Sequence, residues 1–286
     1  MTNPRILLAV LAHPDDETFG TGGTLALYAR SGAQVHLVCA THGEVGEMDP
    51  KYMRGYNSIA ERREAELRCA AEKLGLTGVY FLNYRDSGMP GSPDNTHPDA
   101  LTFQPQDKVA ADVVHYIRLL KPQVVITFDP IGGYRHPDHI AIHKATVQAF
   151  HDAARPEPGP DGLGPFQPSK LYFQTIPRAF LRLVVKILPL FGKNPRQFGT
   201  NKDIDLVSIA EVDFPIHAEI DFGPVAQIRD EASACHASQG GGSPTGGGLM
   251  SRLRWWLVAK EQYMLAYPAP RPGQKRVKDL FEGTGV

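Results

Sequence analysis

A chain of 286 residues, 42% of them hydrophobic, is long enough to bury one large α/β core, alone or with a small appendage. Its 30 basic and 31 acidic residues nearly cancel, which argues against nucleic acid and an anionic membrane as partners. The three cysteines (Cys39, Cys69 and Cys235) are far apart and outside CxxC pairs, so we expect neither a disulfide framework nor a thiolate zinc site. With no signal-peptide pattern at the start, the sequence predicts a reduced, cytoplasmic compartment.

Apolar runs of strand length alternate with helical patterns as far as residue 175. We expect strands at residues 6–12, 34–40, 79–82, 123–128 and 170–175, and helices at residues 20–30, 58–74, 108–120 and 138–154. Continuous apolar strands separated by helices predict an α/β fold with a Rossmann-like, mainly parallel sheet sandwiched by helices. We assign residues 1–176 to this core and residues 177–286 to a smaller C-terminal extension that completes the fold and covers the site.

Two later segments have unusual compositions. Residues 180–192 (FLRLVVKILPLFG) are apolar apart from Arg182 and Lys186, and are too short to span a bilayer. We favour a buried or lid helix on the main domain over an interfacial membrane helix, and therefore expect no membrane association. Residues 239–248 (QGGGSPTGGG) indicate a flexible loop, either a flap near the site or a surface connection.

Two short motifs follow predicted strands. The first is AHPDDE at residues 12–17, in which His13 and Asp16 lie three residues apart across a proline turn and can converge on one ion, leaving Asp15 for another task. The second is HPDH at residues 136–139, at another strand-to-helix junction. Ligands of parallel sheets bind beyond the carboxyl ends of the strands. Both motifs are therefore expected at the ligand-binding edge.

The residue types in these motifs suit a catalytic metal. Zinc in enzymes takes three nitrogen, oxygen or sulfur ligands from the protein and keeps one position open. His13, Asp16 and one histidine of the second motif supply such a set. His139 and His143, spaced i and i+4, form a rival pair, but we prefer His139 because His143 lies one helical turn further from the strand. A His/Asp set also accepts Fe²⁺, Co²⁺ or Mn²⁺.

The pair AHPDDE and GGYRHPDH resembles the PIG-L/LmbE family of metal-dependent N-deacetylases, from about residue 6 to residue 150. Residues 84–89 (YRDSGM) further resemble the branch that deacetylates the glucosaminyl-inositol precursor of mycothiol, and the related thiol-conjugate amidases. The resemblance implies a Zn²⁺-dependent amide hydrolase, with Fe²⁺ or another divalent metal as an alternative, that releases acetate from an N-acetylglucosamine-type substrate. The closest alternative is an amidase that cleaves glucosamine-linked cysteine conjugates.

The resemblance also implies roles by position. It assigns His13, Asp16 and His139 as metal ligands, Asp15 as the general base, His136 and Tyr134 as further catalytic groups, and Arg63 and Asp86 as substrate-binding residues. A bound metal would polarise the amide carbonyl, and Asp15 would take a proton from the attacking water. Two departures leave the exact substrate open: Arg135 stands where a glycine often precedes the histidine motif, and Phe19 stands where some relatives are polar.

Two other classes of function are weaker. Residues 19–23 (FGTGG) superficially resemble a dinucleotide fingerprint, but they lack G-x-G-x-x-G spacing, which argues against a nucleotide-binding oxidoreductase. A metal-binding or sugar-binding module without catalysis has no need of Asp15 beside the ligands. We therefore expect a small-molecule amino-sugar substrate, and the sequence leaves a homo-oligomer open.

Overall fold

The computed structural model describes residues 4–157, 162–176, 178–198, 204–242 and 259–286. One seven-stranded sheet contains β1 (Ile6–Leu11), β2 (Gln34–Thr41), β3 (Gly78–Tyr84), β4 (Val124–Phe128), β5 (Lys170–Thr175), β6 (Ala218–Asp221) and β7 (Lys260–Tyr267). Its order is β3-β2-β1-β4-β5-β7-β6. The first five strands are parallel, β7 is antiparallel to β5, and β6 is antiparallel to β7. The predicted mainly parallel α/β fold is thus confirmed.

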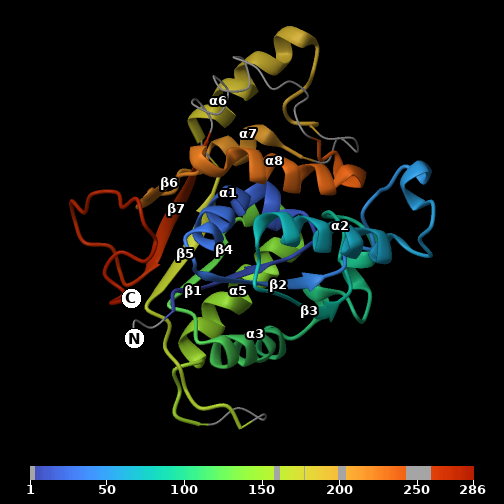
Figure 1. Ribbon diagram of the computed structural model, residues 1–286. Helices are drawn as coiled ribbons and strands as arrows, with labels where there is room; N and C mark the ends of the chain where they lie inside the picture. Colours follow the sequence, from blue (N-terminus) through green and yellow to red (C-terminus); the bar gives the residue numbers. More distant parts are fainter. Residues whose placement is uncertain (1–3, 158–161, 177, 199–203, 243–258) are drawn as a thin grey trace.

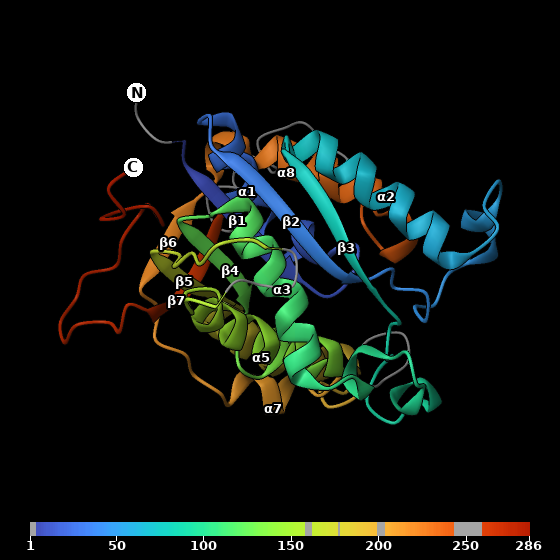
Figure 2. The same ribbon diagram turned by 90° about the horizontal axis from the view of Figure 1, so that it is seen from below.

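Helices cover both faces of the sheet (Figures 1 and 2). One layer contains α1 (Asp16–Arg30), α2 (Ile59–Leu74) and α8 (Ala226–Cys235), and the other contains α3 (Gln106–Leu120) and α5 (Pro137–Asp152). Shorter elements are α4 (Gly132–Arg135), α6 (Arg178–Ile187), α7 (Leu206–Ala210), and the 3₁₀ turns η1 (Pro50–Met53), η2 (Pro93–Thr96), η3 (Leu101–Phe103), η4 (Leu188–Phe191), η5 (Gly223–Val225) and η6 (Ala237–Gln239). Among the described residues, no helix has both the length and the apolar character needed to cross a bilayer.

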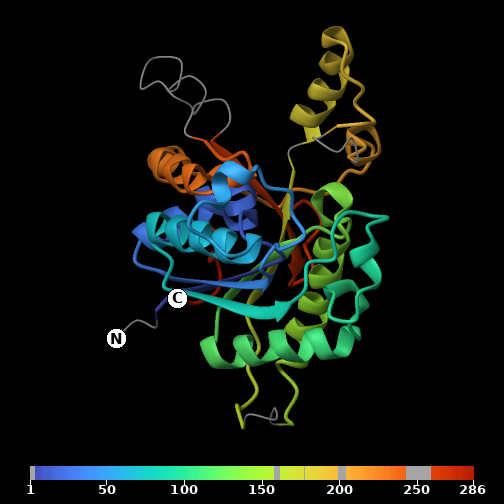
Figure 3. The same cartoon turned by 90° about the vertical axis from the view of Figure 1, so that its right-hand side faces the viewer.

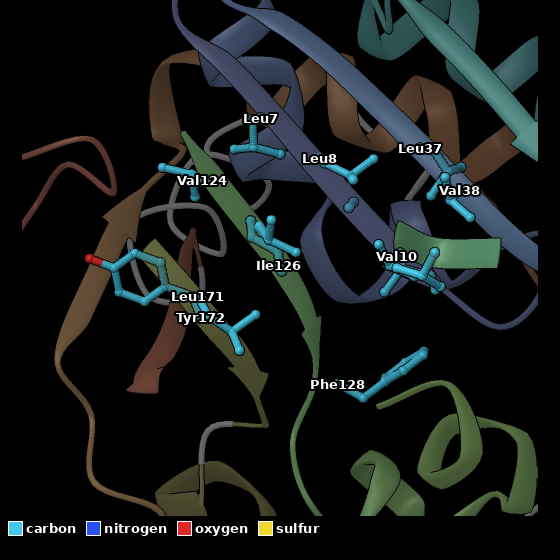
Figure 4. Close-up of a cluster of buried hydrophobic side chains, with 14 of the residues drawn as sticks. Leu7, Leu8, Val10, Leu37, Val38, Val124, Ile126, Phe128, Leu171 and Tyr172 are labelled. Carbon is cyan, nitrogen blue, oxygen red and sulfur yellow. The ribbon is translucent and has the colours of Figure 1, made fainter. Parts of the chain in front are cut away.

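The core of the protein lies along the central strand β1. Side chains such as Leu7, Val10 and Ile126 are completely buried, together with their neighbours on β2 and β5 (Figure 4). Because helices cover both faces of the sheet, the side chains of β1 and β4 are buried whichever face of the sheet they point to. This explains why both strands are continuous apolar runs without polar alternation.

The chain after residue 176 contributes to the same core. β7 and β6 extend the sheet beyond β5, and α8 packs against α1 and α2. This part of the chain therefore shares the sheet and the helix layer of the first 176 residues, while the division at residue 176 and the covering role at the site stay predictions. Of the glycine-rich segment 239–248, residues 243–248 lie outside the described part of the chain.

The contact between α2 and α8 overturns one expectation from the sequence. Cys69 and Cys235 are joined by a disulfide, with their Cα atoms 5.8 Å apart and a sequence separation of 166. Cys39 is a free, buried thiol on β2. The prediction of no disulfide was wrong because the pairing is created by helix packing, which the spacing of three scattered cysteines does not reveal.

The sheet order also fixes where a ligand binds. From β1 the chain moves outward to β2 and β3, and it then returns to the other side of β1 to form β4. Connections that leave two adjacent parallel strands in opposite directions open a crevice beyond their carboxyl ends. Both motifs lie at this switch point, one directly after β1 and one after β4.

Candidate active site

The turn after β1 positions the first motif. The Asp16 carboxylate accepts a hydrogen bond from the His13 backbone N–H at 2.8 Å, and α1 begins at Asp16. Asp15 has φ 126° and ψ −28°, a conformation that side-chain-bearing residues rarely adopt. Strain of this kind costs about 1–3 kcal/mol and persists only where the surroundings enforce it. The turn therefore holds three polar side chains in a fixed arrangement at the end of the central strand.

Three predicted ligands come together across the switch point. His13 Nδ1 lies 3.2 Å from His139 Nε2 and 3.5 Å from the Asp16 carboxylate, and His139 Nε2 lies 3.3 Å from Asp16. Tetrahedral zinc with bonds of about 2.0–2.1 Å separates its ligand atoms by about 3.3 Å, so the contacts within this triangle of side chains, made through both oxygens of Asp16, are close to the spacing of cation ligands. His143 is not part of it, because its Nδ1 bonds to the Phe128 carbonyl oxygen at 2.8 Å.

A carboxylate behind the triangle orients His13. Asp138, which is fully buried, lies 3.1 Å from His13 Nε2 and accepts the Ser87 backbone N–H at 2.9 Å. A proton on Nε2 that is donated to Asp138 leaves Nδ1 free to bind a cation, which is the usual carboxylate–histidine–metal relay. The hydrogen bond thus selects the ring nitrogen that faces Asp16.

Asp138 and Asp86 form a second group with His13 Nε2 whose ligand atoms lie close enough together to hold a cation. Asp86 lies 3.5 Å from that nitrogen, and its carboxylate accepts the Gly88 backbone N–H at 2.8 Å. One oxygen of each carboxylate accepts a backbone N–H, whereas the buried Oδ1 of Asp138 has no hydrogen-bond partner among the described residues. Asp16 and His139, in contrast, border a cavity, so the first group is the better cation site.

The electrostatics of the triangle favour a cation. Burial alone would raise the pKa of Asp16, but His139 and His13 hold it well below its usual range. Burial lowers the pKa of His139 to about 4, which keeps its imidazole neutral. Burial opposes the charged form of His13, but the carboxylates of Asp86, Asp138 and Asp16 raise its pKa well above the usual value. A buried group with this excess of carboxylates is stabilised by positive charge, either a proton or a metal ion.

Asp15 lies beside the triangle and contacts Arg63 of α2. The guanidinium of Arg63 donates to the Asp15 carboxylate at 3.0 Å and to the backbone carbonyls of Pro14 and Gly43, each at 2.8 Å. Burial raises the pKa of Asp15 to about 7, although the positive charge of Arg63 opposes this shift. A carboxylate that titrates near neutrality can both accept and return a proton.

A buried pair behind Asp15 was not identified from the sequence. Glu17 accepts the Asp15 backbone N–H at 2.9 Å with one carboxylate oxygen, and its other oxygen lies 2.7 Å from His236 Nε2. Both side chains are 0% exposed. Glu17 thus helps to hold the strained backbone of Asp15. In the sequence, the only indication of this role was the acidic residue at the end of AHPDDE. The stretch around His236 resembles a family stretch near the mouth of the site, but no local pattern predicts its pairing with Glu17, 219 residues away.

The second motif places a neutral imidazole next to the triangle. His136 Nδ1 accepts the Asp138 backbone N–H at 3.2 Å, which puts the proton of a neutral ring on Nε2. Burial holds the pKa of His136 far below its usual range, so the ring is a neutral donor. One ring nitrogen each of His13, His136 and His139 lie within 4.8 Å of one another.

The turn before this motif presents Tyr134. Its ring lies 5.0 Å from the His139 ring and 5.9 Å from the His136 ring, and burial raises the pKa of its hydroxyl, which keeps it protonated. Gly132 has φ 65°, and a Cβ there would lie 2.8 Å from the His139 Cβ. Arg135 has φ 71°. Arg135, which stands where the family often has glycine, therefore adopts a backbone conformation that glycine tolerates best.

A cavity of about 300 Å³ opens beside the triangle. Its lining combines residues of α1, β4, the α4 turn, α5 and the end of β5 with the residue after it: Asp16, Phe19, Gly20, Phe128, Gly133, Tyr134, His139, Gln174, Thr175 and Ile176. The buried Oε1 of Gln174 has no hydrogen-bond partner. Arg63 and Asp86 are 4% and 3% exposed and lie behind Asp15 and His13, so their predicted role in substrate binding stays a prediction.

The fold and the site together define an α/β protein with a buried His/Asp cluster, suited to a divalent cation, at the switch point of its sheet. The family described as GlcNAc-PI de-N-acetylase (PIG-L) matches residues 8–150, half of the chain. The chain belongs to this family, and it is an N-deacetylase, a hydrolase of amide bonds. The predicted family, the general reaction and the enzyme class are therefore confirmed.

Relatives align with almost the whole chain. Proteins named 1D-myo-inositol 2-acetamido-2-deoxy-alpha-D-glucopyranoside deacetylase from Geodermatophilus obscurus and Thermobifida fusca are each 36% identical, over 99% and 98% of this chain and 99% of theirs. The protein of that name from Kineococcus radiotolerans is 43% identical over 84% of this chain and 70% of its own.

Solved structures show the same fold at lower identity. A conserved protein from Thermus thermophilus superposes with a TM-score of 0.58 at 22% identity, covering 94% of this chain and 98% of that one. The 4-carboxy-2-hydroxymuconate hydratase GalB from Pseudomonas putida gives a TM-score of 0.58 at 19% identity, covering 93% and 98%. Because a hydratase shares the fold, the fold alone does not set the reaction.

Proposed function

We propose that the chain hydrolyses the N-acetyl amide of N-acetylglucosamine joined to myo-inositol, releasing acetate and the free amine. One observation carries the proposal: the facing ring nitrogens of His13 and His139 lie 3.2 Å apart, and each lies 3.3–3.5 Å from one oxygen of the Asp16 carboxylate, next to the carboxylate of Asp15. Relatives named for this substrate align over nearly the full length of the chain, which supports the choice of sugar and aglycone.

We propose Zn²⁺ as the cation held by His13, Asp16 and His139, with Fe²⁺ as a second metal that the same donors accept. When bound, such a cation polarises the amide carbonyl and lowers the pKa of water. The donor set supports this assignment, because two imidazoles and one carboxylate at the distances of a tetrahedron edge form a typical open zinc site.

Asp15 is the proposed general base. Its carboxylate accepts a proton from the attacking water and returns it to the nitrogen of the leaving amine, so that the carbon–nitrogen bond breaks without forming an amide anion. Arg63 and the Glu17–His236 pair hold the side chain and the backbone of Asp15 respectively, which fixes the direction of proton transfer.

His136 and Tyr134 are the proposed donors to the carbonyl oxygen. As negative charge develops on this oxygen, a neutral imidazole N–H and a phenol O–H stabilise it without an unfavourable change of protonation. The Nδ1 of His136 is already occupied by a backbone N–H, so its Nε2–H is the one available. Phe19, Phe128 and Ile176 give the cavity an apolar wall that suits the acetyl methyl group.

Arg63 and Asp86 remain the proposed contacts to the sugar and its aglycone. Arg63 lies 3.0 Å from Asp15, the proposed general base, and Asp86 lies 3.5 Å from His13, a proposed metal ligand. A substrate hydroxyl that reaches either group would fix the acetamide relative to Asp15, which is the role that substrate-positioning residues serve.

The test is an assay of the purified chain with synthetic 1D-myo-inositol 2-acetamido-2-deoxy-α-D-glucopyranoside. Acetate and free amine are measured together for the wild type and for Asp15→Asn, with free N-acetylglucosamine and a glucosaminyl-inositol cysteine amide as comparison substrates. We expect equal amounts of acetate and amine from the inositol glycoside, and a loss of at least a hundredfold in kcat for Asp15→Asn. Amine release from the cysteine amide alone would contradict the proposal and favour the conjugate amidase.

A further inference from the structure

The segment α6–η4 stands away from the body of the protein (Figures 1 and 3). One side of it is packed: Leu181, Val184, Val185 and Leu188 form a cluster with residues of α7 and with Tyr134. These four residues are spaced i, i+3, i+4 and i+7, which places them on one helix face. The predicted packing of this helix on the protein therefore holds for this face only.

A second apolar face of the same segment is exposed. Leu183 and Ile187 are 53% and 38% exposed, and Leu190 and Phe191 are 82% and 74% exposed. Their spacing of i, i+4, i+7 and i+8 runs from α6 into η4, on a part of the surface separate from the packed face. We call these four residues the α6–η4 stripe. Contiguous apolar residues at the surface mark sites of interaction, whereas single ones do not.

Cations accompany the stripe. Residues 181–198 include four basic residues and no acidic one, in a chain whose net charge is −1. Arg182 and Arg196 form ion pairs with Asp213 and Asp205. Lys186 and Lys193 are exposed, and neither forms an ion pair within the described part of the chain.

From this combination we propose, against the expectation from the balanced net charge, that the α6–η4 stripe docks the protein on the surface of an anionic lipid bilayer. Leu190 and Phe191 would enter the boundary between headgroups and acyl chains, and Lys186 and Lys193 would lie at the level of the lipid phosphates. An amphipathic helix with leucine and phenylalanine on one side and lysine beside them has the composition of interfacial membrane helices.

The positive charge beside the α6–η4 stripe favours an anionic lipid surface over a second copy of the chain as the partner. Pairing the stripe with its own copy would bring the unpaired lysines of both copies together, and like charges at an interface are unfavourable. A lone arm with two strongly exposed apolar residues at its end also offers less area than stable protein interfaces bury. An anionic bilayer offers phosphates to the two lysines and an apolar interior to the stripe at the same time.

The experiment measures partition of the full-length protein into vesicles by sedimentation. Vesicles of phosphatidylcholine with 30% phosphatidylglycerol are compared with pure phosphatidylcholine at about 0.15 M salt. The variants are Leu190→Ser/Phe191→Ser and Lys186→Gln/Lys193→Gln. The matched control is Phe103→Ser/Leu119→Ser, which removes two apolar side chains that are 57% and 47% exposed elsewhere on the surface.

We expect the wild type and the control to bind the anionic vesicles. The Ser/Ser variant of the stripe should lose at least tenfold in partition coefficient, because two large apolar side chains no longer enter the lipid. The Gln/Gln variant should lose about 25-fold, since each lysine near an anionic surface contributes about fivefold. Absence of wild-type binding, or equal binding by the stripe variants, would overturn the proposal. A wild-type dimer that becomes monomeric in the Ser/Ser variant, without vesicle binding, would identify the stripe as a contact between copies instead.

Discussion

Asp138→Asn tests how the proposed cation site is held together. The buried carboxylate of Asp138 orients His13 through the 3.1 Å contact with Nε2, and the amide has nearly the same shape but no charge. A hydrogen bond to a charged group contributes about 1.5–3 kcal/mol, and the loss of a carboxylate behind a metal-binding histidine typically weakens metal affinity about 10–100-fold. We therefore expect the dissociation constant for Zn²⁺ to rise by that factor.

The assay is a competition titration of the metal-free protein against a chromophoric chelator. The control is Asp107→Asn, the same chemical change at an exposed position of α3, and its affinity should equal that of the wild type. An affinity within threefold of the wild type in a folded Asp138→Asn protein would refute the orienting role. Complete loss of metal would instead place Asp138 among the ligands, in the group that it forms with His13 and Asp86.

Three further predictions concern Asp15 and the stability of the fold. Arg63→Gln removes a positive charge and should raise the pKa of Asp15, which burial already raises to about 7. The acid limb of the kcat/KM–pH profile should therefore move to higher pH, and an unchanged limb would show that it does not report the titration of Asp15. Cys69→Ser removes the disulfide to Cys235, which lies 166 positions later in the sequence. The free energy of unfolding, measured in urea, should fall by about 2–5 kcal/mol, and an unchanged value would contradict the pairing. Arg135→Gly relieves a positive φ and should raise Tm by about 2 °C in a calorimetric scan, and a lower Tm would count against strain at this position.

The parallel part of the fold was predictable because each strand has a local signature. β1, β2, β4 and β5 are buried on both faces, so each is a run of apolar residues whose limits could be placed within one or two residues. The antiparallel strands β6 and β7 were not predicted individually. Their burial alternates with exposure, and their place in the sheet depends on a partner far away in sequence.

Contacts across long sequence distances explain what the sequence did not reveal at the site. The strand-to-helix junctions and the residue types in both motifs predicted that His13, Asp16 and His139 meet, and the structure places them together. The Glu17–His236 pair depends instead on how α8 packs against α1, which no local pattern encodes. The same packing produces the disulfide that the cysteine spacing did not predict.

The central claim is that His13, Asp16 and His139 bind one divalent cation that is required for amide hydrolysis. The most direct measurement is the metal content of the purified full-length protein after dialysis against Zn²⁺, together with acetate release before and after chelation, for the wild type, His139→Gln and His143→Gln. We expect about one equivalent of metal and chelator-sensitive activity in the wild type and in His143→Gln, and loss of both in His139→Gln. Full metal content and activity in His139→Gln, or activity that survives complete removal of metal from the wild type, would contradict the account.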